Sequence, residues 1–509
     1  MNVLLLSMPD SFEHMPTVAI RMPNGALTSL AGNVDAHHSV AVADLVLMQS
    51  SVKQTVERLV HELRPDVVGL SVMTFQRITA FKIARLIRSL RPTVHIVVGG
   101  YDPSLAPHAY ETCPEVQFIV RGEGEQTFSD LLRALEAHGG FEHIPGLSYR
   151  TAAGFVANPN RPIARLAADP PRLPRRSSRV LTGYTLMGRQ VDVVETSRGC
   201  TYDCSFCSII EMRGRNFHPY AIERVLADIG DARRHGAQAI FLVDDNITLD
   251  IHRFESLCEA IIESGYNDVQ YFVQAMTSPL AQYGDRLAPL MRRARFRYVF
   301  LGIENVLEDD LAFLKAAAKN AHRKHGRTVG NATIDAIQHL HRHGMFVVGG
   351  LIVGNPDDTR ESVEANLEFA RRYVDWPYIQ HPTPYPGTPM TREFRERGLI
   401  VDEDVAHYDG TTAVVRTEHL TATEIEFMRW QAERWIKLRH IPAAFRNNPL
   451  FVLRNSVEMM RETFTGTTIR SMLGLEDAHA PFERFRAQRR RRRENLLPEQ
   501  AVTSAIQAA

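Results

Sequence analysis

Short apolar runs alternate with amphipathic stretches along most of this 509-residue chain, and this alternation restricts the fold more than any other feature. In the first part, segments with the helical period, such as 52–63 and 81–90, separate runs rich in Val, Ile and Leu. These runs read NVLLLS, VAVADLVL, DVVGLSVM, VHIVVGG and VQFIVRG. Strands that alternate with helices in this way lie parallel in one sheet. We therefore expect an α/β fold that begins with a Rossmann-like parallel sheet.

A stretch rich in proline and arginine, ADPPRLPRRSSR, interrupts the pattern as a linker would. The alternation then resumes, with helical segments such as 222–236 and 333–344 between successive strand-like runs. Those runs are VDVVETS, AIFLVDD, VQYFVQA, YVFLGIE, FVVGGLIVG and YIQHPTP. Six such units with right-handed crossovers predict a partial (β/α)6 TIM barrel.

From about residue 390 the pattern is mainly helical and ends in an arginine run, Arg489 to Arg493. We expect this run to be a solvated helix end or a frayed tail. The predicted organisation is an α/β domain over 1–145, a linker over 146–185, the partial barrel over 186–390, and a helical C-terminal region with a basic tail over 391–509.

The charge balance excludes some functional classes. Lys+Arg and Asp+Glu are equal at 59 each, so no overall basic field indicates nucleic acid as a partner, and a small-molecule substrate fits better. The N-terminal apolar run stops at Pro9, and no stretch approaches the roughly 18 apolar residues of a membrane span. Five irregularly spaced cysteines do not form a secreted disulfide framework. We expect a cytoplasmic protein.

Three of the five cysteines, Cys200, Cys204 and Cys207, follow the first barrel strand, where such barrels place their chemistry. One interpretation is a structural zinc site completed by a histidine such as His218, although zinc sites usually pair their cysteines or alternate them with histidines. The other is a [4Fe-4S] cluster, in which three thiolates leave one iron open to another ligand.

The spacing Cys200-x3-Cys204-x2-Cys207, in a loop after the first strand of a partial barrel, resembles the radical S-adenosylmethionine (SAM) superfamily. In that superfamily the three cysteines hold a [4Fe-4S] cluster, whose unique iron chelates SAM. Cleavage of SAM then yields a 5'-deoxyadenosyl radical that abstracts a hydrogen atom from an unactivated carbon. The resemblance implies an enzyme that needs an electron donor such as flavodoxin or ferredoxin.

Downstream segments extend the resemblance in the expected order. FLVDDNIT resembles the segment that holds the SAM amino group, LGIEN the motif near the ribose or amino end, and GGLIVGNP the strand that passes the adenine. PYPGTPM resembles the ending of the sixth strand. Taken singly, each has a structural explanation as a helix cap, an ion pair or a packing site. The SAM-binding residues that the resemblance implies are Phe206, Asp244, Asp245, Asn246, Glu304, Gly350, Ile352 and Gly354.

The first sheet has its own polar strand ends, SVMT, GGYDPS and RGEGEQT, and parallel sheets bind ligands at such ends. Together with the barrel, they resemble the cobalamin-binding class of the superfamily. The usual D-x-H-x-x-G motif is absent, with Asp10 and His14 at the wrong spacing, so we expect no lower axial histidine on cobalt. The alternative is a flavodoxin-like domain without the cofactor. The implied cobalamin-binding residues are Ser71, Thr74, Gly99, Gly100, Tyr101, Gly122, Glu123 and Glu125.

The resemblance implies a methyltransferase in which methylcobalamin delivers a methyl group to an unactivated carbon of a small-molecule or natural-product intermediate. One alternative is a cobalamin-assisted cyclisation or rearrangement without methyl transfer. An alternative of another class is a non-catalytic metal- or nucleic-acid-binding protein. Tyr385 and His381, at the end of the last strand, are the catalytic candidates, and Tyr378, Gln274 and Met276 are further candidates for the substrate pocket.

Other residues are expected to be structural. Cys113 and Cys258 lie apart from the cysteine motif and are predicted to be small buried side chains. The histidines of HLHRHG, at 339–343, suit the end of a helix better than a metal site. Trp430 and Trp435 fit either a helical core or a lid over a bulky ligand.

Overall fold

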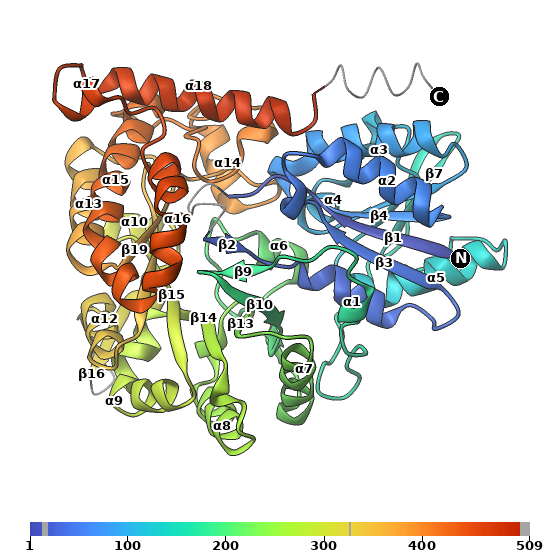
Figure 1. Cartoon of the computed structure of the whole chain (residues 1–509), viewed down its shortest axis with the longest axis horizontal. Coiled ribbons are helices and arrows are strands. Elements are labelled where there is room, and N and C mark those ends of the chain that lie inside the picture. Colours follow the sequence, from blue (N-terminus) through green and yellow to red (C-terminus); the bar gives the residue numbers. More distant parts are fainter. Residues whose placement is uncertain (13–18, 325–326, 499–509) are drawn as a thin grey trace.

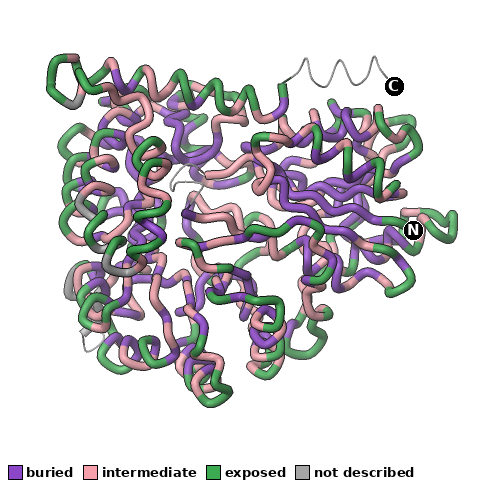
Figure 2. Tube along the Cα trace, viewed as in Figure 1, coloured by how far each residue is buried: buried purple, intermediate pink, exposed green. Residues whose placement is uncertain are grey.

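The computed structural model describes residues 1–12, 19–324 and 327–498. Two sheets lie beside each other, one in the blue N-terminal part and one in the green and yellow middle part (Figure 1). Most of the red helices lie on the side of the second sheet away from the first, and the last one runs along the top toward the blue part. Buried residues concentrate along the strands of both sheets (Figure 2). None of the helices in these ranges combines the length and apolarity needed to cross a bilayer.

The first sheet has seven strands in the order β3-β1-β4-β5-β6-β7-β8. Its parallel part consists of β1 (Asn2–Ser7), β3 (Ser39–Asp44), β4 (Val67–Ser71), β5 (His95–Gly99) and β6 (Phe118–Val120). Two antiparallel strands, β7 (Leu147–Thr151) and β8 (Gly154–Ala157), extend it. The helices are α1 (Gly25–Asn33), α2 (Val52–Leu63), α3 (Arg77–Leu90), α4 (Tyr101–Leu105) and α5 (Gly124–Glu136). The expected Rossmann-like sheet is confirmed.

Helices cover both faces of this sheet, which explains why its strands read as continuous apolar runs. Leu4 and Leu6 of β1 pack into the same cluster as the apolar residues of α2 and α3. Val3 and Leu5 face the other way and pack with α1 and α5. Because successive residues of a strand point to opposite faces, the four positions from Val3 to Leu6 are all buried and all apolar.

The second sheet contains the six parallel strands that the sequence predicts, and the partial barrel is confirmed. They are β10 (Arg189–Val194), β13 (Ala239–Leu242), β14 (Gln270–Met276), β15 (Phe296–Glu304), β18 (Phe346–Ile352) and β19 (Trp376–Gln380). The intervening helices are α7 (Ile222–Arg234), α8 (Ile251–Glu263), α9 (Thr277–Arg293), α10 (Glu308–Phe313), α11 (Ala317–Asn320), α12 (Thr333–Arg342) and α13 (Arg360–Tyr373). A hairpin of β16 (Ala321–Lys324) and β17 (Arg327–Asn331) precedes α12.

Two short antiparallel strands extend the barrel sheet beyond β10, and the sequence did not predict them. They are β9 (Thr185–Leu186) and β2 (Ile20–Arg21). β2 comes from the segment that follows β1, so the first 145 residues contribute a strand to the sheet of the barrel. The boundaries of the four proposed regions stay predictions.

Buried ion pairs fix the proline-rich segment before the barrel. The guanidinium of Arg176 is fully enclosed and donates to the carboxylates of Asp192 at 3.0 Å, Asp228 at 2.6 Å and Asp231 at 2.9 Å. Tyr184 then donates to Asp44 of the first sheet at 2.7 Å. The segment is therefore fastened to both sheets.

The C-terminal region is helical, as predicted. Its elements are α14 (Pro389–Glu396), α15 (Ala422–Asn447), α16 (Pro449–Thr463), α17 (Ile469–Met472) and α18 (His479–Leu496). Trp430 is buried and packs against Phe482 with ring centroids 5.4 Å apart, whereas Trp435 is exposed. Trp430 therefore belongs to the helical core.

The arginine run within α18 differs from the expected solvated end. Arg489 is buried and donates to Glu426 at 2.5 Å, and Arg493 pairs with Asp409. Only Arg490 to Arg492 face solvent. The expectation fails at both ends of the run because distant parts of the chain supply carboxylates there.

Candidate active site

The three clustered cysteines lie in the loop between β11 (Ser197–Arg198) and α6 (Ser208–Arg213). β11 pairs with β12 (His218–Pro219), which closes the base of the loop. Cys200 and Cys204 are buried, Cys207 is half-buried, and all three are free thiols. The backbone N–H of Cys207 donates to the carbonyl of Cys204 at 3.1 Å. The loop thus gathers three thiols at the carboxyl end of the first barrel strand.

The spacing of these thiols argues against a single zinc ion. In the described part of the chain, the one group of three or more potential ligands with all atoms within 4.8 Å is His37, His38 and Glu136. The cysteines do not meet this limit, either alone or with His218. Zinc binds sulfur at about 2.3 Å, so thiolates on one zinc ion lie roughly 4 Å apart. The wider spacing fits a four-iron cluster better.

A buried ion pair lies beside the cysteines. Glu304 ends β15 with a left-handed φ of 62°, where the pairing with β18 shifts register. Its carboxylate accepts from Nζ of Lys319 at 2.8 Å, and this ammonium lies 5.6 Å from the ring of Phe206. Burial alone would lower the pKa of Lys319, but Glu304 and the thiols of Cys204 and Cys207 outweigh it and raise the pKa above its ordinary value. The positive charge of Lys319 therefore lies beside the cysteine thiols, where a negatively charged cluster would bind.

Two aspartates that follow β13 hold the base of the cysteine loop. Asp244 accepts from the backbone N–H of Thr196 at 2.7 Å and from the hydroxyls of Thr196 and Ser197 at 2.5 Å. Burial raises its pKa to about 6. Asp245 accepts from the backbone N–H of Gly199 at 2.8 Å. The predicted second-strand residues therefore contact the loop directly, although these bonds support the loop rather than a ligand.

Asn246, the third residue of this predicted group, has a free donor. Its Oδ1 accepts from the backbone N–H of Thr248 at 3.1 Å and from the hydroxyl of Thr248 at 2.8 Å. Its Nδ2 is buried and has no partner among the described residues. Buried amide donors are rarely left without an acceptor. A ligand with carboxylate or hydroxyl oxygens, such as SAM, fits this donor.

Most of the residues that the resemblance assigns to the adenine of SAM lie at the carboxyl edge of β18. Ile352 is buried in one apolar cluster, and Phe206 and Tyr385 pack against that cluster. Gly354 has a φ of 100°, and its N–H donates to Asp358 at 2.8 Å. A Cβ on Gly350 would lie 2.8 Å from Cζ of Phe300, so only glycine fits there without movement. The structure thus brings Phe206 and Ile352 together, as the resemblance implies.

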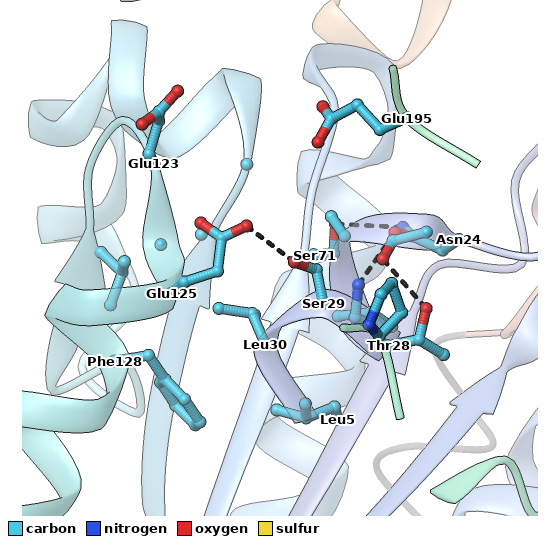
Figure 3. A pocket seen from close by; sticks show the side chains of 18 of the residues that line it. Leu5, Asn24, Thr28, Ser29, Leu30, Ser71, Glu123, Glu125, Phe128 and Glu195 are labelled. Atoms are coloured by element: carbon cyan, nitrogen blue, oxygen red, sulfur yellow. Dashed lines mark hydrogen bonds between the residues drawn. The ribbon is translucent and has the colours of Figure 1, made fainter. Parts of the chain in front are cut away.

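A cavity of about 370 Å³ lies at the carboxyl edge of the first sheet. It runs inward beside β1 and β4, where the strand order reverses and such sheets bind ligands. Glu123 and Glu195 lie at one end of it, and Leu5 and Phe128 at the other (Figure 3). Seven of the predicted cobalamin-binding residues line it, namely Ser71, Gly99, Gly100, Tyr101, Gly122, Glu123 and Glu125.

One predicted residue does not reach this cavity. Thr74 is buried in a short 3-10 helix (Thr74–Gln76) and is not among the lining residues. The N-cap and first turns of α1 line the cavity instead, with Asn24, Thr28 and Ser29 as their polar members. Asn24 donates to the hydroxyl of Ser71 at 3.2 Å, and Ser29 donates to Glu125 at 2.8 Å (Figure 3). Sequence reasoning missed this segment because its polar residues carry no recognisable motif.

Arg198 joins the cavity to the cysteine loop. It stands two residues before Cys200 and is 6% exposed. Its guanidinium donates to Glu195 at 2.7 Å and to Glu125 at 2.6 Å, and lies 3.5 Å from Glu123. Burial alone would raise the pKa of Glu125, but Arg198 outweighs it and lowers that pKa to about 2. One buried cation therefore ties carboxylates of the cavity to the loop.

A second arginine lies at the same boundary. Arg213, at the end of α6, lies 3.6 Å from Asp245 and 4.0 Å from Glu123. Tyr101 begins α4, which contacts α6, and burial raises the pKa of its hydroxyl, with the charge of Asp245 adding to the shift. The cavity and the cysteine loop are thus neighbours with a shared wall.

The two catalytic candidates differ in their surroundings. His381 is buried, its Nδ1 contacts the carbonyl of Val353 at 3.2 Å, and burial lowers its pKa to about 3. Tyr385 donates to the carbonyl of Tyr408 at 3.3 Å. The Nε2 of His381 is buried and has no partner among the described residues, and a catalytic role for either residue stays a prediction.

The remaining pocket candidates lie on the barrel strands. Tyr378 packs against Phe300, with ring centroids 5.1 Å apart. Met276 is buried at the end of β14, and its backbone N–H donates to the hydroxyl of Thr248 at 3.1 Å. Gln274 is half-buried on the same strand. A role in substrate binding stays a prediction for all three.

The residues expected to be structural make ordinary contacts. Cys113 and Cys258 are fully buried. His339 and His341, near the end of α12, face two different aspartates at 3.4 Å and 2.7 Å, so these two histidines do not share a partner. His14, which the cobalamin motif argument names, lies outside the described residues.

Sequence reasoning missed three charged residues of the site, Lys319, Arg198 and Arg213. Arg198 had a signal, because it stands two residues before the first cysteine of the motif. Lys319 had none, since it follows Glu304 by 15 residues in an alanine-rich segment. Only the folded chain brings it to Glu304.

Comparison with known families gives two matches. Residues 15–132 match the model of the B12 binding domain, and residues 194–370 match that of the Radical SAM superfamily. The first match contains the lining residues of the cavity from Pro23 to Phe128. The second contains the cysteine loop, Asp244 and Glu304.

Similar proteins cover most of the chain. An uncharacterized methyltransferase of Pyrococcus horikoshii is 27% identical over 429 residues, which cover 84% of this chain and 90% of that protein. The anaerobic magnesium-protoporphyrin IX monomethyl ester cyclase of Synechocystis is 25% identical over 466 residues, covering 89% and 87%. The structure of TsrM from Kitasatospora setae, a radical S-adenosylmethionine methyltransferase with cobalamin and [4Fe-4S] cluster bound, has a TM-score of 0.62 at 20% identity over 78% of each chain. At this identity the likeness concerns the fold.

Proposed function

Because this chain belongs to the cobalamin-binding radical SAM enzymes, we propose that it methylates an unactivated carbon of a small-molecule or natural-product intermediate. The observation that carries the proposal is the shared wall between the cavity and the cysteine loop, in which Arg198 contacts Glu125 and Glu195. A methyl donor and a radical source must act on one substrate, so their sites must adjoin. A methyltransferase of similar length is also among the relatives.

The proposed roles follow from the chemistry of each side chain. Cys200, Cys204 and Cys207 would hold the cluster, since three thiolates leave one iron open. The free Nδ2 of Asn246 would donate to SAM, and Lys319 with Glu304 would fix its charged end. When bound, the cluster, SAM and cobalamin supply a carbon-centred radical and a methyl group. The protein's part is to hold them in one orientation and to exclude water.

Cobalamin would occupy the cavity of the first sheet. Gly99 and Gly100 follow the edge of β5, where Gly100 has a φ of 107° and a Cβ would lie 2.8 Å from the carbonyl of Val72. The ends of β4 and β5 therefore pack closely at this edge of the cavity, and only glycine fits there. Glu123 and Glu125 add acceptors near its mouth.

We expect the full-length chain to bind cobalamin without a protein histidine on cobalt. None of the described residues that line the cavity is a histidine. After reduction to Co(II), the electron paramagnetic resonance spectrum should lack nitrogen superhyperfine splitting from the protein. Splitting that disappears in a His14→Ala variant would contradict this expectation, and failure to bind cobalamin would contradict the cofactor assignment itself.

A cyclisation or rearrangement without methyl transfer is the second candidate. A relative named as a cyclase matches over 89% of this chain and 87% of its own length, so the same architecture serves this chemistry too. The barrel mouth can hold either kind of substrate, because the fold does not determine the reaction. The two candidates differ in what happens to the methyl group of SAM.

The distinguishing experiment follows that methyl group. With the anaerobically reconstituted chain, a reductant, a candidate substrate and SAM labelled in its methyl group, a methyltransferase should give labelled product. Each product should appear with one S-adenosylhomocysteine and one 5'-deoxyadenosine, since one SAM supplies the methyl group and another the radical. Unlabelled product with 5'-deoxyadenosine alone would favour cyclisation or rearrangement.

Two further parts of the proposal concern the surroundings of the enzyme. The cluster must be reduced, and we infer a protein donor such as flavodoxin or ferredoxin. We place the enzyme in the cytoplasm, where reducing conditions keep cysteines available for a cluster. Co-purification with a reduced flavodoxin that supports SAM cleavage would test the first part.

A further inference from the structure

The outer surface of the C-terminal helices is rich in apolar side chains. Of the fifteen large apolar residues that are exposed in the described part of the chain, ten lie between residues 435 and 475. On α16, Leu450, Leu453, Val457 and Met460 are 78%, 61%, 81% and 42% exposed. Their spacing of three and four residues places them along one side of the helix. A solvent-facing helix normally carries polar residues there. We call these four residues the α16 stripe.

The opposite side of α16 is already fixed to the protein. Phe451 and Val452 are buried in a cluster with Ala19, and Met187 packs against that cluster. Asn448, just before the helix, donates to the carbonyl of Met187 at 2.6 Å. Along α16, exposed residues alternate with buried and intermediate ones, as they do along the C-terminal helices in Figure 2. The α16 stripe therefore points outward from a helix whose core side is occupied.

Positive charge accompanies the stripe. Arg454 and Arg461 are exposed, and their positions in the helical period place them on the same side as Leu450 and Val457. Neither forms an ion pair with another described residue. Residues 435–475 contain six Lys and Arg and two Glu, and of the cations Lys437 and Arg470 are paired with Glu433 and Glu476. The exposed Arg492 of α18 lines the same pocket as Met460 and Arg461 of α16.

From this combination we propose that the outer face of α16 binds the surface of an anionic lipid bilayer. Apolar side chains on such a helix enter the boundary between headgroups and acyl chains, while arginines bend toward the phosphates. Each arginine close to an anionic surface adds to the attraction. A second copy of this chain would present the same net positive face, so like charges would oppose pairing. The bilayer is therefore the partner that satisfies both features of the face.

The test is vesicle flotation with the full-length chain. It should float with phosphatidylcholine vesicles that contain phosphatidylglycerol, bind pure phosphatidylcholine much more weakly, and lose affinity as salt rises. The double variant Arg454→Gln with Arg461→Gln should bind the anionic vesicles about thirty-fold more weakly. The double variant Leu453→Ser with Val457→Ser should lose at least about tenfold.

The matched controls carry serine at exposed apolar residues elsewhere. Ile78 and Val401 are 40% and 52% exposed, and Ile78→Ser with Val401→Ser should bind like the parent chain. Circular dichroism checks that each variant is folded. Absence of binding to anionic vesicles, or equal binding by the stripe variants, would overturn the proposal. So would a dimer in light scattering that Leu453→Ser with Val457→Ser converts to monomer, because that result would assign the face to a second copy.

Discussion

Single replacement of Cys200, Cys204 or Cys207 by alanine is expected to remove the cluster iron and to abolish SAM cleavage. All three are free thiols in one loop, and Lys319 beside them supplies a positive charge that suits a negatively charged cluster. Two thiolates do not hold a cluster with one open iron. Iron content, the visible absorbance of the reconstituted chain and the formation of 5'-deoxyadenosine should fall together.

The chain contains matched controls for this experiment. Cys113 and Cys258 are as deeply buried as Cys200 but lie in the cores of the first sheet and of the barrel. Their replacement by alanine should lower stability slightly through a small cavity and leave iron and SAM cleavage unchanged. Full SAM cleavage by a Cys204→Ala chain would show that the cluster has other ligands. Retention of one bound zinc in place of iron would favour the structural zinc site.

Arg198→Met should be the most destabilising single change at the boundary between the two cofactor sites. The variant leaves Glu125 and Glu195 in a buried place without their cation. Removing one partner of a buried ion pair costs about 3–5 kcal/mol. The free energy of unfolding, measured with urea, should fall by that amount, and cobalamin binding should weaken because Glu125 lines the cavity.

The pH dependence should change in a defined direction. The pKa of Glu125 falls from 4.5 to about 2 on folding, so its stabilisation is complete above the unfolded value and is lost as the pH falls toward 2. In Arg198→Met, burial should instead raise this pKa, and the variant should regain relative stability as the pH falls. Addition of Glu125→Gln should restore part of the loss at neutral pH.

Arg133→Met serves as the control for Arg198→Met. Arg133 also donates to a carboxylate, that of Asp35 at 2.8 Å, but its side chain is 50% exposed. Exposed pairs of this kind contribute roughly 0–1 kcal/mol. If Arg198→Met proved as mild as Arg133→Met, with unchanged cobalamin affinity, the bridge between the two sites would have no structural importance.

The strands were predictable because a strand that is buried on both faces is a continuous run of apolar residues in the sequence. In β1, Val3 and Leu5 face one helical layer while Leu4 and Leu6 face the other. Each of the four is apolar because a layer of helices covers it. The short strands β2 and β9 left no such mark. Each has only two residues, too few for a period, and what makes them strands is pairing with each other and with β10.

The site divides in the same way. The cysteines, Asp244 and Glu304 stand in local motifs that survive in the linear sequence. Lys319 reaches Glu304 only because the chain turns back through α11. Thr74 was placed at the cavity because it follows a strand, but a 3-10 turn buries it instead. Contacts of this kind depend on how distant segments pack together. The apolar periodicity of a single sequence does not contain that information.

The strand β2 has a consequence for recombination between related enzymes. The order of motifs suggests a cut near residue 145, yet Ile20 and Arg21 pair with Leu186 and Thr185 across it. A chimera that takes its first 145 residues from a relative would import the outermost strand of the barrel sheet along with the cofactor domain. The graft would succeed only where the donor carries a strand of matching register. Exchange of such domains therefore has to preserve the pairing of the edge strand β2 with β9 as well as the packing of the domain core.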